Sequence, residues 1–357
     1  MLRKLFLAAT TAMVFFVSQA QDSTMKVSYS GGIDGYYRYN FSNQANNYTS
    51  FTNSQSSFEL GMATVKADAT AMSGKVGATV DLGFGRRAEE FSYNDGVSDA
   101  GKNGFASLAF VKQAYVTYAA TKKLKFTAGK FFTHVGYEML DAPLNRNYSM
   151  SYMFTNGPFF HTGLKADIVA GPIGLMVGLT NYTDQSTAST GTKNFIAQAS
   201  YVSKSEKIKA YLNYSGFAGA DSGKNPSGLK SIHQIDAVVN AIINKQFSVG
   251  YNGTVQSRKP TVGSSGNWIG NALYINYDPT SSIGLTLRSE FISDDKKIYF
   301  ATKNIFANTI SLNYKVGPLS IIPELRFESA ESEYYLKSDA TTTKSTASVL
   351  VAVVYKF

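Results

Sequence analysis

Charged side chains stand at alternate positions of segments that are otherwise apolar or aromatic. Asp34 and Arg38 fall on one face of the first such segment, and Arg288 and Glu290 fall on one face of another. An extended strand points successive side chains to opposite faces, so this spacing separates the charges from the apolar residues. Carboxylates and guanidinium groups gathered in this way can hydrate a tunnel, or pair across neighbouring strands and stiffen its wall.

The apolar faces of these segments indicate contact with lipid. A charge facing lipid at the membrane midplane would cost about 2–4 kcal/mol, so each mid-strand charge is expected to face inward. The same parity turns Phe160 and Leu164 toward the lipid. The side chains expected to line the lumen are Asp34, Arg38, Asp81, Lys130, His134, His161, Lys165, Asp167, Asp236, Arg288, Glu290, Glu324 and Arg326.

The pattern leaves one segment unassigned and makes one prediction about the lining as a whole. The segment 107–119 is left unassigned, because placing Lys112 inside turns Gln113 outside. Inward cations and anions are nearly balanced, which predicts a lining that wets readily and does not select sharply between ions.

Histidine is the residue type that could add catalysis or metal binding to this wall. His134 and His161 are expected on adjacent strands near the same rim, and His233 is the third histidine. Catalysis needs a nucleophile, a base and an orienting group, and a metal site needs a third ligand; the spacing defines neither. We therefore predict no catalytic residue, no metal site and no cofactor, and we do not expect an enzyme.

About sixteen segments with this alternation, separated by turn residues, must position the charges. Strands can cross a membrane only when they close into a barrel, and bacterial barrels have even strand numbers. We predict an all-β fold, a transmembrane antiparallel up-and-down β-barrel. Its strands are expected at 27–41, 57–71, 75–85, 107–119, 124–136, 158–170, 174–184, 194–203, 207–217, 231–243, 246–257, 267–278, 282–293, 304–316, 319–330 and 345–357.

The connections between these segments alternate between short turns and long polar loops, as in barrels with periplasmic turns and extracellular loops. The long connection 137–157 is rich in aromatic residues and methionine, which is unusual for a loop in solvent. We hypothesise that it folds into the barrel as a constriction and presents Glu138, Asp141 and Arg146 to the lumen. The alternative is a lid packed on top of the barrel, and loop 86–106 competes for the constriction role.

The start of the chain has the pattern of an export signal. Arg3 and Lys4 precede an apolar stretch and a small-residue exit, so residues 1–20 are expected to be a Sec-type signal peptide and residues 21–357 the barrel. Loss of Arg3 and Lys4 lowers the formal charge from +9 to +7. Because an exported chain meets no nucleic acid, its basic balance does not predict a nucleic-acid partner. The absence of cysteine excludes disulfides and thiolate metal sites.

Several stretches of the sequence resemble the OmpL-like β-barrel porin family of outer-membrane proteins. The resemblance implies an outer-membrane pore of about this size and no particular substrate. The terminal Phe357 also resembles the signal by which the barrel-assembly machinery recognises a C-terminal strand. The similar stretches are FELGMATVKAD (58–68), KVGATVDLGFGRRAEE (75–90), VKQAYVTYAATKKLKFTAGKFFTHVGYE (111–138) and NYSMSYMFTNGPFFHTG (147–163).

The sequence favours a porin of the Gram-negative outer membrane, with a water-filled channel for passive diffusion of small polar solutes. The alternative is a surface-exposed barrel that acts as an adhesin or structural protein without an open pore. The expected surroundings are outer-membrane lipid, and a homotrimer is an expectation for which the sequence shows no interface stripe. A soluble β-sandwich is disfavoured, because the alternating short and long connections do not fit a Greek key.

Overall fold

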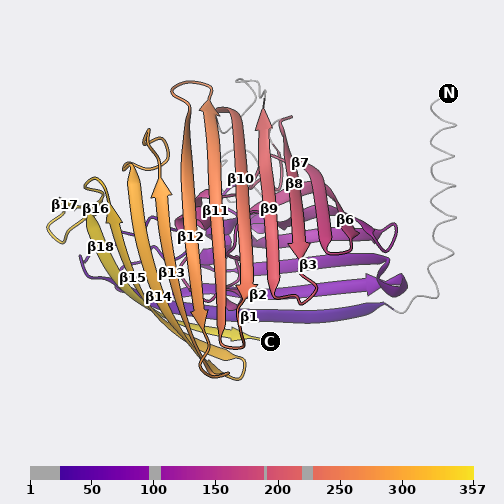
Figure 1. Ribbon diagram of the computed structural model, residues 1–357, viewed down its shortest axis with the longest axis horizontal. Coiled ribbons are helices and arrows are strands. Elements are labelled where there is room, and N and C mark those ends of the chain that lie inside the picture. The colour runs from indigo at the N-terminus through magenta and orange to yellow at the C-terminus, as the bar shows by residue number, and fades with distance from the viewer. Residues whose placement is uncertain (1–24, 96–105, 189–190, 219–227) are drawn as a thin grey trace.

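The computed structural model describes residues 25–95, 106–188, 191–218 and 228–357, so the expected signal peptide, residues 1–20, lies outside the described residues. Sixteen antiparallel strands form one closed barrel, in which each barrel strand pairs with the next and the last pairs with the first. In Figure 1, strands β9 to β12 stand upright at the front while β1 and β2 cross behind them, as the tilt of a barrel wall requires. The predicted fold class and strand number are confirmed.

The strand bounds differ from the expected ones by at most three residues, except at two strands. The fourth begins four residues later because Ala106–Phe110 forms a short 3-10 helix (η2), and the fifth ends four residues earlier. The barrel strands are β1 (Lys26–Asn40), β2 (Ser57–Ala71), β3 (Val76–Phe84), β4 (Val111–Ala119), β5 (Leu124–Phe132), β6 (Phe160–Ala170), β7 (Ile173–Asn181), β8 (Lys193–Val202), β9 (Ile208–Ala218), β10 (Leu229–Ile242), β11 (Phe247–Pro260), β12 (Gly266–Tyr277), β13 (Ile283–Ser293), β14 (Asn304–Val316), β15 (Leu319–Ala330) and β18 (Ser345–Lys356).

Small elements occupy the connections. The turn after β2 holds the 3-10 helix η1 (Met72–Gly74), and the last long loop holds a separate hairpin of β16 (Tyr335–Leu336) and β17 (Thr342–Thr343). Three others lie in the second and third long loops: α2 (Arg86–Phe91), η3 (Ala142–Leu144) and α3 (Tyr152–Asn156).

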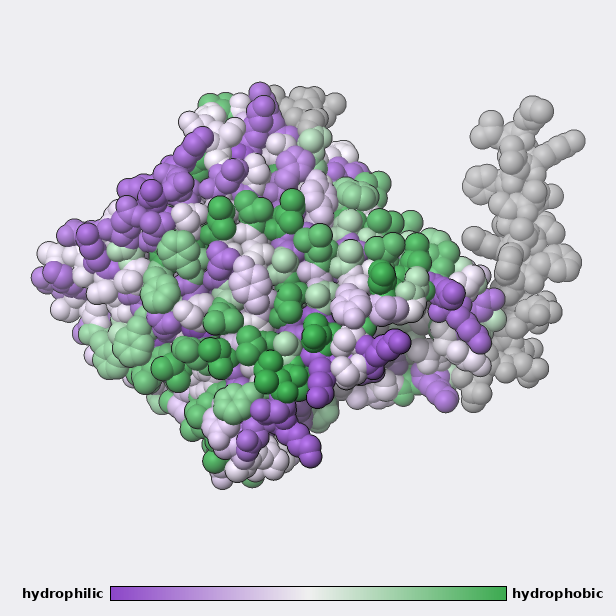
Figure 2. All heavy atoms as spheres, viewed as in Figure 1, coloured by the Kyte–Doolittle hydropathy of each residue, from purple (hydrophilic) through white to green (hydrophobic). Residues whose placement is uncertain are grey.

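The outer face of the barrel is apolar. Ile33, Leu212 and Val353, from three different strands, are 54%, 56% and 47% exposed. Figure 2 shows apolar side chains gathered across the middle of the near face, with polar residues toward its ends. A barrel presents a band of this kind to lipid. Within the described ranges, no helix is both long and apolar enough to cross a bilayer.

The last strand closes the barrel against the first. Phe357 and Gly31 exchange two backbone hydrogen bonds, each with an N···O distance of 3.0 Å. Pairing then runs from Ile33 opposite Tyr355 to Asn40 opposite Ser348. A Cβ on Gly31 would come within 2.6 Å of the Phe357 ring, so glycine is what lets the terminal aromatic lie over the first strand.

The inner face of the barrel is not uniformly polar. Leu350, Ala352 and Val354 of β18 point inward together with Ile322 of β15, and all four are nearly inaccessible to solvent. Apolar side chains in a water-filled lumen would lose the free energy of burial, so their low exposure requires a cover. The long loops that fold into the barrel supply that cover.

Candidate functional site

The connection between β5 and β6, residues 133–159, lies inside the barrel, and we call it the inner loop. It leaves the wall at β5 yet contacts β13, β14 and β15, which begin eight places further around the ring of sixteen strands. One such contact is a hydrogen bond of 2.7 Å from Asn147 Nδ2 to Ser311 Oγ on β14. The inner loop therefore crosses the lumen to the opposite wall and does not sit on top of the barrel.

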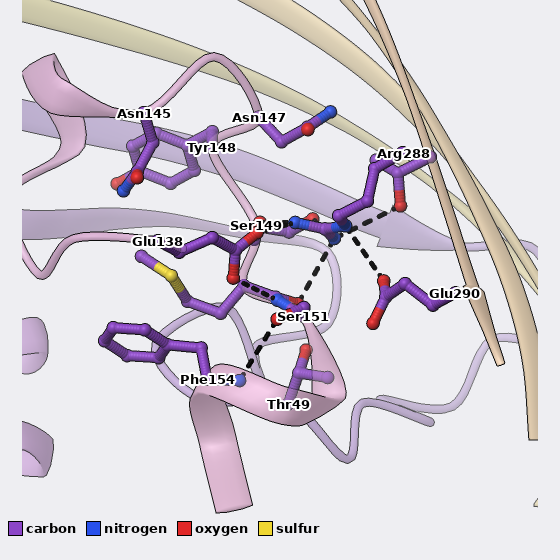
Figure 3. A network of polar contacts seen from close by, with 12 residues as sticks. Thr49, Glu138, Asn145, Asn147, Tyr148, Ser149, Ser151, Phe154, Arg288 and Glu290 are labelled. Carbon is purple, nitrogen blue, oxygen red and sulfur yellow. Dashed lines mark hydrogen bonds and ion pairs between the residues drawn. The ribbon is translucent and has the colours of Figure 1, made fainter. Parts of the chain in front are cut away.

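A buried ion cluster lies where the inner loop meets this wall (Figure 3). Arg288 contacts Glu138 of the loop (Nη1–Oε1, 2.6 Å) and Glu290 of its own strand (Nε–Oε1, 2.9 Å). Arg326 bridges Glu290 (Nη1–Oε1, 3.1 Å) and Glu328 (Nη2–Oε1, 3.0 Å). These five side chains are at most 5% exposed. Charges at such depth are tolerated only when paired and hydrogen-bonded, and here the pairing joins loop to wall.

The backbone of the inner loop is held by the same wall. Arg288 donates from Nη1 to the Ser149 carbonyl (2.6 Å) and from Nη2 to the Met150 carbonyl (3.2 Å). Glu324 accepts from the Tyr148 N–H at 2.9 Å, and Glu290 accepts from the Tyr152 N–H at 2.8 Å. Because the loop forms no sheet here, these side chains satisfy backbone groups that would otherwise be buried without partners.

Two tyrosines anchor the loop by their hydroxyls. Tyr152 Oη donates to Glu328 Oε1 at 2.8 Å, and Tyr148 Oη donates to Asp34 on β1. Gly61 makes the second contact possible: a Cβ there would lie 1.8 Å from Asp34 Oδ2 and 2.4 Å from Tyr148 Oη. The register of β1 and β2 shifts at this point, since Asp34 faces Met62 while Gly35 faces Leu60. A bulge at Gly61 thus opens room for the tyrosine.

Two short helices, α3 of the inner loop and α2 of the second long loop, also take part in holding the inner loop. Ser151 caps α3, with its Oγ accepting from the Phe154 N–H at 3.1 Å. From the second long loop, α2 inserts Arg87, whose guanidinium lies 5.0 Å from the Phe51 ring and 4.8 Å from the Tyr148 ring. Arg87 also donates to the Leu140 carbonyl at 3.1 Å. The second and third long loops therefore pack together inside the barrel.

A bulge answers the open assignment of Lys112 and Gln113. On β4, Gln113 faces Asp81 while Val111 faces Leu82, so Lys112 is the extra residue and both side chains turn inward. Lys112 Nζ contacts Asp81 Oδ1 at 3.0 Å and Asp141 Oδ1 of the inner loop at 2.6 Å. A strand with strict alternation could turn only one of these two residues inward. The bulge lets both side chains face the lumen.

The three inner-loop residues expected at the constriction each pair with a different part of the wall. Glu138 pairs with Arg288, Asp141 with Lys112, and Arg146 Nη2 with Asp278 Oδ1 at 2.6 Å. Their side chains are 5%, 17% and 30% exposed. Glu138 is therefore a structural contact, whereas Arg146 keeps part of its surface open to the lumen.

Near the long-loop rim, Lys130 is buried beside the Phe160 ring, with Nζ 3.8 Å from the ring centroid, and pairs with Asp95 Oδ2 at 2.8 Å. The expected outward orientation of Phe160 is wrong: it is fully buried in a cluster with Phe91 of α2. The second long loop reaches inside and covers it.

Loop residue Asp184 accepts from the backbone N–H of Phe160 at 3.0 Å. Burial raises the pKa of Asp184 to about 6, although this hydrogen bond opposes the shift.

His134 and His161 lie side by side with ring centroids 5.5 Å apart. His134 Nε2 is 2.9 Å from the Tyr214 carbonyl oxygen, and His161 Nε2 is 3.1 Å from Thr133 Oγ1. In the part of the chain that the structure describes, no three imidazole or carboxylate groups gather into a metal site. The two rings, one from the inner loop and one from β6, pack where the inner loop leaves the wall.

The other expected lining residues fall into two groups. Buried ones are tied to neighbours: Arg38 Nη1 donates to the Ala45 and Ser54 carbonyls at 2.6 and 2.8 Å, and Asp236 accepts from Asn213 Nδ2 at 2.8 Å. Partly exposed ones include Lys165, which pairs with Asp167 at 3.0 Å, with side chains 23% and 26% exposed. The expected readily wetted lining does not hold for the ion cluster, because the inner loop covers it.

Reasoning from parity missed the apolar part of the inner face. Tyr36, Ile322, Leu350 and Val354 sit at inward positions of three neighbouring strands and pack against Tyr148 of the inner loop. The signal was in the sequence: apolar residues at lumen-facing positions of adjacent strands predict a segment that covers them. The expected lining included only charged residues and histidines.

Two pockets flank the inner-loop segment 144–146. One, of about 190 Å³, is lined by Asn145 and Asn147 of the loop and by Asn240, Tyr274 and Asn276 of the wall. The other, of about 230 Å³, lies against β14, β15 and β18. Both hold space for water and small solutes beside the loop.

Sequence comparison identifies one family. The family described as “Putative beta-barrel porin-2, OmpL-like” matches residues 26–357. No curated protein sequence matches the chain.

Solved structures share the fold at low sequence identity. The outer membrane channel DcaP of Acinetobacter baumannii has a TM-score of 0.63 at 12% identity, covering 93% of this chain and 97% of that one. The anion-selective porin from Comamonas acidovorans has a TM-score of 0.64 at 12% identity, covering 94% and 100%. OmpT of Vibrio cholerae has a TM-score of 0.59 at 11% identity, covering 93% and 98%. At these identities the likeness concerns the fold alone.

Proposed function

We propose, from the premise that this chain belongs to the OmpL-like β-barrel porin family, that the inner loop sets the size limit of an outer-membrane channel for small polar solutes. Membership in that family makes the protein a porin of the Gram-negative outer membrane, and a non-enzymatic channel is part of the proposal that family and fold support. The proposal concerns how the lumen is narrowed and what passes through it.

The observation that carries the proposal is the course of the inner loop across the lumen. A sixteen-strand barrel encloses an aqueous channel unless side chains or loops narrow it. Here the loop spans from β5 to the wall at Arg288 and is fastened there by the buried ion cluster. Solutes would pass beside segment 144–146, along amide, phenol and charged side chains that suit polar solutes.

Planar-bilayer recording tests the channel, and liposome swelling with a series of sugars of increasing size tests its limit. We expect discrete single-channel steps and swelling that stops at small oligosaccharides. A protein that migrates as folded on heat-modifiability gels yet neither conducts nor supports swelling would overturn the proposal. That outcome would favour the adhesin or structural alternative, which no comparison supports.

Assembly of the barrel is part of the same proposal. Residues 1–20 would direct Sec export, and the barrel-assembly machinery would recognise the terminal strand through Phe357, whose side chain is 63% exposed at the outer surface. Deleting Phe357 should lower the amount of folded protein in the outer membrane; unchanged amounts would remove this role. Cross-linking in native membranes tests for the homotrimer, which predicts a ladder ending at three subunits.

A further inference from the structure

The pocket of about 230 Å³ beside the inner loop lies at the short-turn end of the lumen. Its roof is the loop segment 142–146, and its wall is formed by the ends of β14, β15 and β18. It is separate from the buried ion cluster. A solute leaving the lumen on this side of the loop would meet this pocket last.

Three cations and no acid line this pocket, whose lining lies wholly within the described residues. Arg146 is neutralised by Asp278 through contacts of 2.6 and 3.1 Å. Lys315 and Lys356 are exposed and have no ion pair or side-chain hydrogen bond within the described part of the chain. Two uncompensated positive charges therefore face the same small space.

Strand register aims both lysines inward. Lys315 follows the buried Asn313 by two positions on β14, and Lys356 follows the buried Val354 by two positions on β18. Lys315 faces Ser320 across the sheet, and Ser320 faces Val354 on the next strand. Lys356 lies two positions beyond Val354, where its backbone N–H donates to the Pro318 carbonyl at 3.2 Å, so both lysines border the end of β15 in the pocket wall.

The rest of the pocket supplies an apolar surface. Pro143 and Leu144 of the inner loop line it, and Leu144 is 61% exposed. A pocket with two free ammonium groups at one end and an apolar patch beside them suits a solute with an anionic head and a small apolar body.

We propose that this pocket binds small organic anions, with a carboxylate held between Lys315 and Lys356 and the apolar body against Pro143 and Leu144. The inference rests on the proposed channel function, because diffusion through the lumen is what brings solutes to the pocket. It makes the short-turn mouth a place where carboxylates are retained and neutral solutes of the same shape are not.

The surroundings of the pocket add a weaker, longer-range attraction. The seven short turns, all within the described residues, contain two acids, Glu206 and Asp278, against six lysines. The lysines are Lys75, Lys122, Lys123, Lys204, Lys207 and Lys245. Their field raises the local concentration of anions and is screened by salt.

The test compares benzoate with benzamide, which has a similar shape and no charge. Saturation-transfer NMR on the folded barrel in zwitterionic detergent measures binding, and single-channel recording with each probe on the short-turn side measures block. The variant K315Q/K356Q removes the two pocket lysines. The variant K204Q/K245Q removes the same charge from turns outside the pocket and serves as the matched control.

For the native protein we expect benzoate to bind and block while benzamide does neither. K315Q/K356Q should weaken benzoate binding roughly tenfold, and K204Q/K245Q should change it less than twofold in molar salt, where the Debye length is about 3 Å. Equal effects of benzoate and benzamide, or equal affinity in the native protein and K315Q/K356Q, would overturn the inference. Because NMR needs no current, a barrel that binds benzoate but never conducts would overturn the channel and leave the pocket standing.

Discussion

The charges of the lumen behave differently where the inner loop covers them and where it does not. At the inner loop, Arg288, Glu290 and Arg326 are at most 3% exposed and contact both loop and wall. Away from that cover, Lys165 and Asp167 form a pair on one strand, with side chains 23% and 26% exposed. Residues of the same types in the same strand pattern thus hold a loop in place at one part of the wall and stay accessible to solvent at another.

This difference shows that an inward charge is not by itself a solute contact. A buried pair must be complete, since removing one partner leaves an uncompensated charge away from water. A half-exposed pair can lose a partner to solvent with little cost. The buried charges therefore hold the inner loop, and the partly exposed charges are the ones within reach of solvent.

Breaking the ion cluster should lower stability more than either of the two changes that follow. Arg288→Met leaves the buried Glu138 without its guanidinium partner and removes one of the two guanidinium groups that contact Glu290. It should destabilise the packing of the inner loop against the wall by about 3–5 kcal/mol. Trp268, the single tryptophan, packs in a cluster with Tyr152 and Met153 of the inner loop. Its fluorescence therefore reports whether the loop is packed against the wall. Urea titration followed at Trp268 should show an earlier transition than in the native protein. An unchanged midpoint would mean that the cluster does not hold the loop.

Removing one anchoring hydroxyl should have an intermediate effect. Tyr148→Phe leaves the buried Asp34 carboxylate without its donor and should cost about 1–3 kcal/mol in the same titration. Tyr29→Phe is the matched control, because Tyr29 is 73% exposed and should lose less than about 0.5 kcal/mol. If the two variants lose the same stability, the Tyr148–Asp34 contact is not an anchor.

The half-exposed pair should give the smallest effect. Lys165→Gln removes the partner of Asp167 where water can replace it, and the expected cost is about 0–1 kcal/mol. The difference from the native protein should shrink further in high salt, because screening already weakens the pair. A loss as large as that of Arg288→Met would show that cover by the inner loop does not decide the role of a charge.

The barrel itself could be predicted from the sequence because each strand carries its own signal. Alternation over ten or more residues, charges on one parity and turn residues between segments fix strand number and order, as for 57–71, 304–316 and 319–330, whose bounds agree with the structure. The pattern failed where backbone geometry departs from a regular strand. The bulge at Lys112 and the turn of the chain from β5 into the inner loop after Phe132 depend on contacts across the lumen.

The site was less predictable because its contacts join distant segments. Composition marked 137–157 as a loop that should be buried, but many of its partners are distant in the chain. Glu290 lies 138 residues beyond Tyr152, and Glu324 lies 176 residues beyond Tyr148. Parity predicts that Glu290 faces inward, but it does not predict that Glu290 accepts a hydrogen bond from the backbone N–H of Tyr152. The role of Gly61 likewise follows only from the position of Tyr148 beside Asp34.

Single-channel conductance of a variant lacking residues 141–153 tests the central claim most directly. This deletion removes η3 and the loop residues that Arg288 and Glu324 hold, so the lumen beside the ion cluster should fill with water. The variant, shown to be folded by heat-modifiable migration, should conduct severalfold more than the native protein and admit larger sugars in liposome swelling. Unchanged conductance from a folded variant would contradict the account, because the inner loop would then not be what narrows the channel.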